Sequence, residues 1–322
     1  PMPRHLFTKV LCQAALLWLS VAPAQAVVTT TAPSNWLGSS DARLDGVGKF
    51  TSGGTLCSAS LLAGGAYAIT AAHCVSGGAP GVNVSSGQVA FKGGTVTATF
   101  SSSAQVSVFP TWAGEGANGE GLGFNNDIAL IALDTTVTQI SGYQILPMDP
   151  LGLPVLLAGF GLTGVGETGF EAGTGGTLHW GSNVYDALLS GPGSSYVFDF
   201  DNGQAANNLM GGLGLGVYEA SIAPGDSGGS TFADISGTLW LVGVHSFIGR
   251  DDAGTTDIDA VQNSTYGEFA GDTALYTSAN LAWINSVVAV PEPASALLSL
   301  AGLSLVGGVV GLQRRGRRSG TA

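Results

Sequence analysis

Short runs of apolar and β-branched residues alternate along the middle of the chain with clusters of Gly, Ser, Asn and Pro. Many such runs in series indicate an all-β domain built as a sandwich or as barrels. The runs that we interpret as strands are Tyr67–Val75, Gly87–Phe100, Asp127–Asp134, Leu153–Gly161, Ser195–Phe200 and Leu239–Phe247. A helical pattern occurs late, where Leu281, Ile284 and Val288 fall on one face of Asn280–Val288. The pattern therefore predicts an all-β domain followed by one helix.

The first 26 residues have the pattern of a secretory signal peptide and not of a fold element. Arg4 and Lys9 precede the apolar run Val10–Val21, and Ala24–Ala26 has the small-x-small form that signal peptidase cleaves. We therefore expect export across the inner membrane, with signal peptidase as a processing partner and a mature chain beginning at Val27.

The C-terminal segment carries a second processing signal. The sequence "VPEPAS" at Val290–Ser295 precedes the uncharged span Ala296–Leu312 and the basic cluster Arg314–Arg318, which is typical of the cytoplasmic side of a membrane. Residues 291–318 resemble the PEP-CTERM sorting signal of Gram-negative bacteria. The resemblance implies transient membrane contact, cleavage by a sorting protease near residue 293, and a final location in the periplasm, on the cell surface or outside the cell. The alternative is a permanent single-span anchor.

Charge narrows the range of partners. Residues 27–290 hold four basic and 21 acidic residues, so their net charge is 4 − 21 = −17, compared with −12 for the whole chain. Such a surface repels nucleic acid and anionic lipid, so we exclude nucleic acid as a partner.

Cysteine usage agrees with export. Cys12 lies in the signal peptide, and Cys57 and Cys74 remain as an even pair, for which one disulfide is the natural interpretation. The mature chain keeps three histidines, namely His73, His179 and His245. This set argues against a structural zinc site, and we expect neither metal nor cofactor.

The stretch "APGDSGGS" at Ala223–Ser230 surrounds Ser227 with three glycines. Such a serine is either part of a tight turn or an exposed nucleophile, and a nucleophile needs a base and an acid that orients the base. His73 in "AITAAHC" and Asp127 in "NNDIALIAL" are the candidates, and His–Asp–Ser is one of the known triad orders. The α/β-hydrolase elbow fits poorly, because a strand pattern follows Ser227.

Three motifs together resemble the trypsin-like (chymotrypsin-fold) serine endopeptidases. They are "TAAHC" at Thr70–Cys74, "NNDIALIAL" at Asn125–Leu133 and "GDSGGS" at Gly225–Ser230, in that order. The resemblance implies two six-stranded antiparallel β-barrels, at about 27–150 and 151–290, with the active site in the cleft between them and a C-terminal helix.

The resemblance also implies roles for individual residues. His73 and Asp127 would come from the first barrel and Ser227 from the second, Cys57 would pair with Cys74, and the N–H groups of Gly225 and Ser227 would form an oxyanion hole. The implied activity is hydrolysis of peptide bonds in proteins or peptides through an acyl-enzyme. The alternative is a catalytically inactive surface-binding module on the same fold.

The resemblance places Ser221 at the base of the substrate pocket. Trypsins carry an acid there, so Lys and Arg are not the expected substrate residues. Ser246, Ile248 and Ala274 fall at the pocket walls, and their bulk predicts cleavage after a small apolar residue. His245 keeps an alternative open, because glutamate-specific relatives carry a pocket histidine at this place.

Two further features are left open by the sequence. The amine of Val27, freed by signal cleavage, either pairs with Asp226 as the family's activating N-terminus does, or belongs to an unordered tail. The acidic stretch Arg250–Ala260 is either a solvated loop or a calcium site, although it has no recognised loop spacing.

Overall fold

A computed structural model describes residues 27–30, 41–115, 126–190, 193–212, 214–251, 253 and 255–288. The proposed signal peptide and the predicted span Ala296–Leu312 lie outside these residues. Within them, no helix has both the length and the apolar character needed to cross a membrane.

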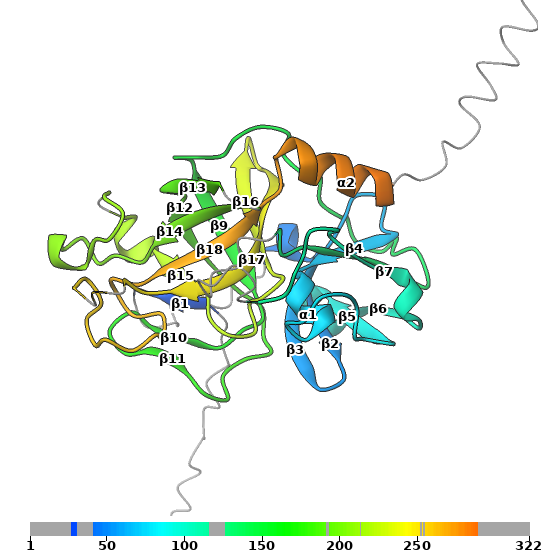
Figure 1. Cartoon of the computed structure of the whole chain (residues 1–322), viewed down its shortest axis with the longest axis horizontal. Coiled ribbons are helices and arrows are strands. Elements are labelled where there is room, and N and C mark those ends of the chain that lie inside the picture. Colours follow the sequence, from blue (N-terminus) through cyan, green and yellow to red (C-terminus); the bar gives the residue numbers. More distant parts are fainter. Residues whose placement is uncertain are drawn as a thin grey trace, which may run out of the picture.

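The first half of the molecule is one antiparallel sheet that rolls into a barrel-like body. Its strand order is β6-β5-β2-β3-β4-β8-β7. This body lies on the right in Figure 1. The strands are β2 (Val47–Ser52), β3 (Thr55–Leu61), β4 (Tyr67–Thr70), β5 (Gly87–Phe91), β6 (Val96–Phe100), β7 (Val106–Val108) and β8 (Ala129–Ala132).

The second half is a second rolled sheet, in the order β12-β9-β16-β17-β18-β14-β13. Its strands are β9 (Pro154–Gly159), β12 (His179–Val184), β13 (Ala187–Ser190), β14 (Ser194–Asp199), β16 (Ser230–Ile235), β17 (Thr238–Gly249) and β18 (Phe269–Ala274). The prediction of an all-β fold with two barrel-like halves is confirmed, although each main sheet has seven strands in place of six.

A small third sheet, in the order β11-β10-β1-β15, contains β1 (Val27–Thr29), β10 (Thr163–Val165), β11 (Gly169–Glu171) and β15 (Ala220–Ser221). The expected boundaries assigned residue 27 to the first barrel, but β1 pairs with β10 and β15 of the second half. This pairing buries Val27 and Val28, which are at most 2% exposed. The burial of these two side chains explains why the N-terminal strand crosses to the second half.

Two α-helices, α1 (Ala72–Ser76) and α2 (Ser278–Val288), complete the regular structure together with short 3₁₀ turns. The 3₁₀ turns are Ala42–Leu44, Lys92–Gly94, Ser103–Gln105, Ala205–Asn207 and Gly216–Tyr218. The α2 helix returns to the first half (Figure 1), where Ile284 is part of the hydrophobic core. The rings of Trp283 and Phe109 pack edge to face, with their centroids 5.1 Å apart. The last helix therefore fastens the end of the second half to the first.

Two of the predicted strands are broken in the structure. Gly87–Phe100 is a hairpin, because Gly93 and Gly94 adopt positive φ angles between β5 and β6. Tyr67–Val75 is a strand only to Thr70; α1 (Ala72–Ser76) then follows and is capped by Gly77, which has a φ of 64°. A disulfide joins Cys74 on this helix to Cys57 on β3, with the Cα atoms 6.2 Å apart.

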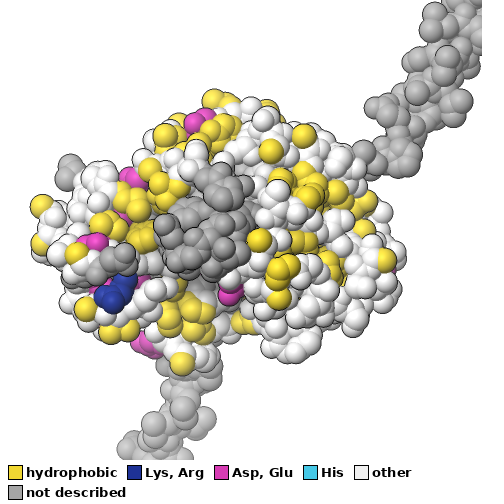
Figure 2. Space-filling model, viewed as in Figure 1, with side chains coloured by type: hydrophobic (Ala, Val, Ile, Leu, Met, Phe, Trp, Pro, Cys, Tyr) yellow, Lys and Arg dark blue, Asp and Glu magenta, His cyan; other side chains and the backbone are white. Residues whose placement is uncertain are grey.

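The surface agrees with the acidic composition. On the face drawn in Figure 2, basic side chains are confined to a small patch at the lower left, and acidic side chains are scattered around it.

Candidate active site

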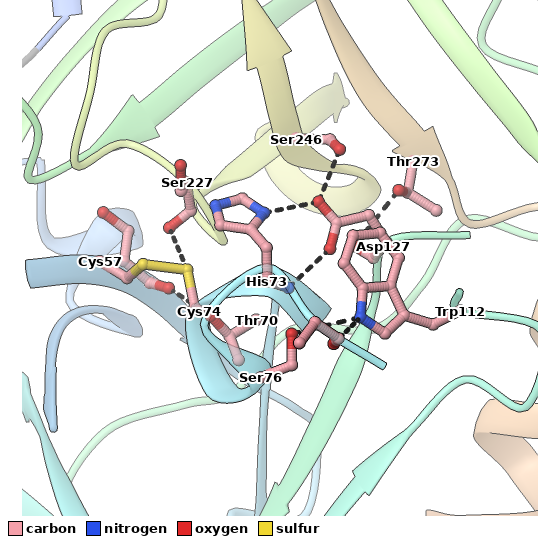
Figure 3. A network of polar contacts seen from close by, with 12 residues as sticks. Cys57, Thr70, His73, Cys74, Ser76, Trp112, Asp127, Ser227, Ser246 and Thr273 are labelled. Atoms are coloured by element: carbon pink, nitrogen blue, oxygen red, sulfur yellow. Dashed lines mark hydrogen bonds and ion pairs between the residues drawn. A yellow bond between two sulfur atoms is a disulfide. The ribbon is translucent and has the colours of Figure 1, made fainter. Parts of the chain in front are cut away.

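His73 lies on α1 and forms two hydrogen bonds to one carboxylate. Its backbone N–H donates to Asp127 Oδ1 at 2.9 Å, and the ring Nδ1 lies 2.7 Å from Asp127 Oδ2. A carboxylate only accepts hydrogen bonds, so the ring proton is on Nδ1 and Nε2 is left as an acceptor. Figure 3 shows the ring lying between Asp127 and Ser227.

Asp127 precedes β8 in the first half but is held by the second half. The hydroxyl of Ser246 on β17 donates to Asp127 Oδ2 at 2.7 Å, and the hydroxyl of Thr273 on β18 donates to the Asp127 carbonyl at 3.3 Å. The Asp127 residue is 1% exposed. The carboxylate therefore bridges the two halves while it orients His73.

Burial and the neighbouring acidic groups have opposite effects on the pKa of His73. Burial disfavours the charged ring and lowers its pKa, whereas the charge and hydrogen bond of Asp127, with a smaller contribution from the Glu115 charge, raise it. The acidic groups prevail, and the pKa of His73 lies above its usual value of 6.5. The site therefore stabilises an imidazolium.

Ser227 lies on the loop between β15 and β16, and two glycines make its conformation possible. Gly225 and Gly228 have φ angles of 97° and 77°. A Cβ at Gly228 would meet Thr70 Oγ1 at 2.1 Å, and one at Gly225 would meet Gly161 Cα at 2.8 Å. Only glycine fits such close approaches at positive φ, which explains the spacing of the motif.

Two backbone N–H groups of the Ser227 loop are available to a ligand. Among the described residues, the backbone N–H groups of Gly225 and Ser227 donate to no backbone carbonyl, while those of Asp226 and Gly229 close turns. No hydrogen bond joins Ser227 Oγ to His73 within the described chain. Such contacts are often long before substrate binds.

Ser58 is a positioning residue that the sequence did not single out. Its backbone N–H donates to the Ser227 carbonyl at 2.8 Å, and its hydroxyl donates to the Gly225 carbonyl at 3.0 Å. Phe160 N–H donates in turn to the Ser58 hydroxyl at 2.9 Å. Ser58 follows Cys57, so the disulfide region of the first half holds the Ser227 loop of the second. Serine is too common in this chain for sequence alone to mark this one.

Asp226 has a fully buried carboxylate that accepts hydrogen bonds from several backbone N–H groups. Gly161 N–H donates to Oδ1 at 2.8 Å and Ala223 N–H donates to Oδ2 at 2.9 Å, and the Val27 N–H also donates to this carboxylate. Burial raises the pKa of Asp226 to about 6, against the opposing effects of the His245 charge and these hydrogen bonds. The structure thus brings Val27 and Asp226 together.

A cleft of about 480 Å³ opens beside these residues. Two of the predicted wall residues, Ser246 and Ile248, line it together with the three triad candidates. The lining residues that sequence reasoning missed are Trp112, Glu115, Ile222, Ala223, Pro224, Phe247 and Gln262. Those at 222–224 directly precede the serine motif, and this adjacency was the available signal for them.

Three of the predicted pocket residues do not line the cleft. Ser221 is 1% exposed and pairs with Val28 across the small sheet. Ala274 is fully buried and pairs with Gly243, whereas Ala270 stands opposite Ile248. Ala274 therefore lies away from the lining of the cleft, and Ala270 is the residue that pairs with Ile248 at the wall.

His245, the third of these residues, belongs to a buried polar group. Its Nδ1 lies 2.7 Å from Asp272 Oδ1, and Tyr185 and Thr231 donate their hydroxyls to the other oxygen of Asp272. His245 and Asp272 are 0% exposed, and His245 Nε2 has no hydrogen-bond partner. This histidine therefore lies beneath the cleft and not at its surface.

Two groups of side chains among the described residues have the proximity that metal binding needs. In the first, Cys57 and Cys74 lie near His73, but their disulfide removes the thiolates that bind metals. The second consists of Asp257, Asp259 and Glu268 and lies on the insertion before β18.

The arrangement is that of the chymotrypsin fold, with a serine, a histidine and a carboxylate meeting where two barrel-like halves join. The trypsin family model matches residues 40–267, more than two thirds of the 322-residue chain. The chain therefore belongs to the trypsin family.

Two solved structures are similar to the chain. The protease Anisep from Arthrobacter nicotinovorans is 16% identical with a TM-score of 0.49, and the match covers 77% of this chain and 97% of that protein. A Glu endopeptidase in complex with MPD is 16% identical with a TM-score of 0.51, and the match covers 83% of this chain and 98% of that protein. The second similarity supports the fold alone. No curated protein matches the chain.

Removal of the Glu115 charge tests the electrostatics around His73. Because that charge contributes to the raised pKa, Glu115→Gln should lower the pKa of His73, so that the ring loses its proton at a lower pH. NMR titration of the His73 ring protons in the Ser227→Ala protein measures the shift. Glu171→Gln removes an exposed charge at the end of β11 and should leave the titration unchanged. An unaltered His73 pKa in Glu115→Gln would refute the assigned contribution.

Proposed function

We propose that the protein is an exported serine endopeptidase with Ser227, His73 and Asp127 as its catalytic triad. The observation that carries the proposal is the 2.7 Å contact between His73 Nδ1 and Asp127, which leaves Nε2 as an acceptor in the cleft that Ser227 also lines. Membership of the trypsin family supports the same activity.

The proposed reaction uses each of these groups once per half-reaction. Ser227 Oγ attacks the substrate carbonyl while His73 Nε2 takes its proton, and Asp127 stabilises the imidazolium that forms. The oxyanion accepts hydrogen bonds from the Gly225 and Ser227 N–H groups. His73 then protonates the leaving amine, and water, activated by the same ring, releases the acid from the acyl-enzyme.

An active-site label tests this function. A fluorophosphonate should react with the exported protein at Ser227, and Ser227→Ala should abolish the label and reduce casein hydrolysis by roughly 10⁴–10⁶-fold. Ser190→Ala, at the exposed end of β13, should keep both activities. A folded protein that takes no label and cleaves no casein would instead be an inactive binding module on this fold.

The lining of the cleft favours a small apolar residue before the scissile bond. Ile222, Ala223 and Ile248 contribute apolar surface to the cleft. Ser221, which the resemblance places at the base of the pocket, carries no charge to bind Lys or Arg. One observation favours glutamate as the alternative: Asp272 holds Nδ1 of His245, and the unpartnered Nε2 of the same ring lies behind Ser246, where it is the ring nitrogen left for a substrate carboxylate.

Peptide-library profiling separates the two preferences. We expect Ala or Val before the cleaved bond, and we expect His245→Gln to leave that preference intact. A dominant preference for Glu that is lost in His245→Gln would replace our choice with the alternative.

We also propose that both ends are processed. Signal cleavage would free the amine of Val27 beside Asp226, and sorting would remove the tail after about residue 293. The protein would then reach the periplasm, the cell surface or the medium, and peptides or proteins would be its substrates. Intact mass of the exported protein measures both cuts. A mass that still includes Arg314–Arg318 would identify the tail as a permanent anchor.

A further inference from the structure

The insertion between β17 and β18 gathers three carboxylates at one point. Asp257, Asp259 and Glu268 each place an oxygen so that these atoms all lie within 4.8 Å of one another. The hydroxyl of Thr265, which is fully buried, stands among them at 3.2 Å from Asp257 Oδ1, 3.5 Å from Asp259 Oδ1 and 3.4 Å from Glu268 Oε1. The single hydroxyl proton of Thr265 can be donated in a hydrogen bond to only one of these three oxygens at a time.

The surrounding backbone fixes these carboxylates in place. The N–H groups of Asn263 and Ser264 donate to the two oxygens of Glu268, each at 2.8 Å. The Asp259 N–H donates to Asp257 Oδ1 at 3.0 Å. The oxygens are thus positioned by contacts within the loop.

Among the described residues, no basic side chain forms a salt bridge with this group. Within the described part of the chain, the salt bridges involve other acids, and none reaches Asp257, Asp259 or Glu268. Glu268 is 1% exposed. Uncompensated buried carboxylates are costly, so a cation would stabilise the group.

Two buried oxygens at this group have no hydrogen-bond partner. Asp257 is 9% exposed and its Oδ2 accepts no hydrogen bond, although Oδ1 of the same carboxylate lies in the group. The side-chain oxygen of Asn263 is also buried and unpartnered, while its amide nitrogen donates to Asp259 Oδ2 at 3.0 Å. An unpartnered, nine-tenths-buried carboxylate oxygen is the feature that distinguishes a ligand site from an ordinary acidic loop.

We propose that Asp257, Asp259 and Glu268 bind a divalent cation, with the side-chain oxygen of Asn263 as a further ligand. Calcium fits the donor set, because it takes six to eight oxygen ligands in flexible geometry. A donor set of oxygens alone suits zinc less well than calcium, because zinc prefers nitrogen and sulfur ligands. Magnesium keeps several waters and demands a near-octahedral arrangement.

The site would also influence the proposed active site. Gln262 lines the cleft and donates from Nε2 to the Ile248 carbonyl at 2.9 Å, and the Ser264 hydroxyl donates to the Ile222 carbonyl at 2.7 Å. Ile248 and Ile222 both line the cleft. Calcium would therefore order one wall of the cleft. This consequence rests on the proposed function, whereas cation binding does not.

Calorimetry tests the site independently of activity. The exported Ser227→Ala protein, stripped with a chelator, should bind one Ca²⁺ more tightly than Mg²⁺. At 100 times the Kd, Ca²⁺ should raise the melting temperature by roughly 5–10 °C. Asp257→Asn and Asp259→Asn should each weaken Ca²⁺ binding at least tenfold, and Glu171→Gln should leave it unchanged.

Asp259 keeps the test decisive, because its side chain is exposed and its replacement does not disturb the core. The proposal is overturned if the stripped protein binds no Ca²⁺ at about 10 mM. It is equally overturned if binding survives intact in both Asp257→Asn and Asp259→Asn, since the ion would then occupy another acidic group. Cleavage by the Ser227 protein with and without Ca²⁺ then measures the effect on KM. If Ca²⁺ binds but no cleavage occurs, only the proposed function fails.

Discussion

The buried carboxylate of Asp226 is the contact on which the geometry of the Ser227 loop depends. A buried charge is tolerated only when it is paired or well hydrogen-bonded, and here the donors come from three separate segments, at Val27, Gly161 and Ala223. Because Asp226 directly precedes Ser227, its anchoring restricts the positions of the Ser227 side chain and of the neighbouring N–H groups. The raised pKa of Asp226 indicates that the backbone donors do not fully offset its burial. A free ammonium at Val27 would supply the missing charge.

The same site holds the two halves of the molecule together. Asp127 from the first half accepts from Ser246 of the second, and Ser58 of the first half holds the Ser227 and Gly225 carbonyls of the second. The α2 helix adds an apolar contact in the opposite direction through Trp283 and Phe109. The arrangement of His73, Asp127 and Ser227 therefore depends on contacts between the two halves.

The sequence predicts the fold class and the triad candidates because these depend on local patterns. Strand alternation and glycine spacing are readable in one dimension, and the need for glycine at Gly225 and Gly228 is visible in the structure as positive φ and close approach. The position of His73 on a helix was not predicted, since Tyr67–Val75 is apolar enough to continue as a strand.

The features that could not be predicted from the sequence depend on strand register and on contacts between residues far apart in the chain. Ile248 pairs with Ala270 and Gly243 with Ala274, with a register shift between His245 and Phe247 that has no sequence motif. Ser58 and Gln262 act through backbone carbonyls distant in sequence, and such contacts leave no motif. The acidic stretch 250–260 left a solvated loop and a calcium site open, and it did not include Glu268, which lies near Asp257 and Asp259 only in the folded chain.

The central claim is that an anchored Asp226 assembles a reactive Ser227, and the rate of fluorophosphonate labelling measures this directly. Protein that begins at Val27 should react far faster than the same protein that begins at Ala26, in which the extra residue moves the ammonium away from Asp226. The loss of one oxyanion donor costs about 10²–10³ in rate, and a difference of that size is expected. Equal labelling rates for the two proteins would contradict the account.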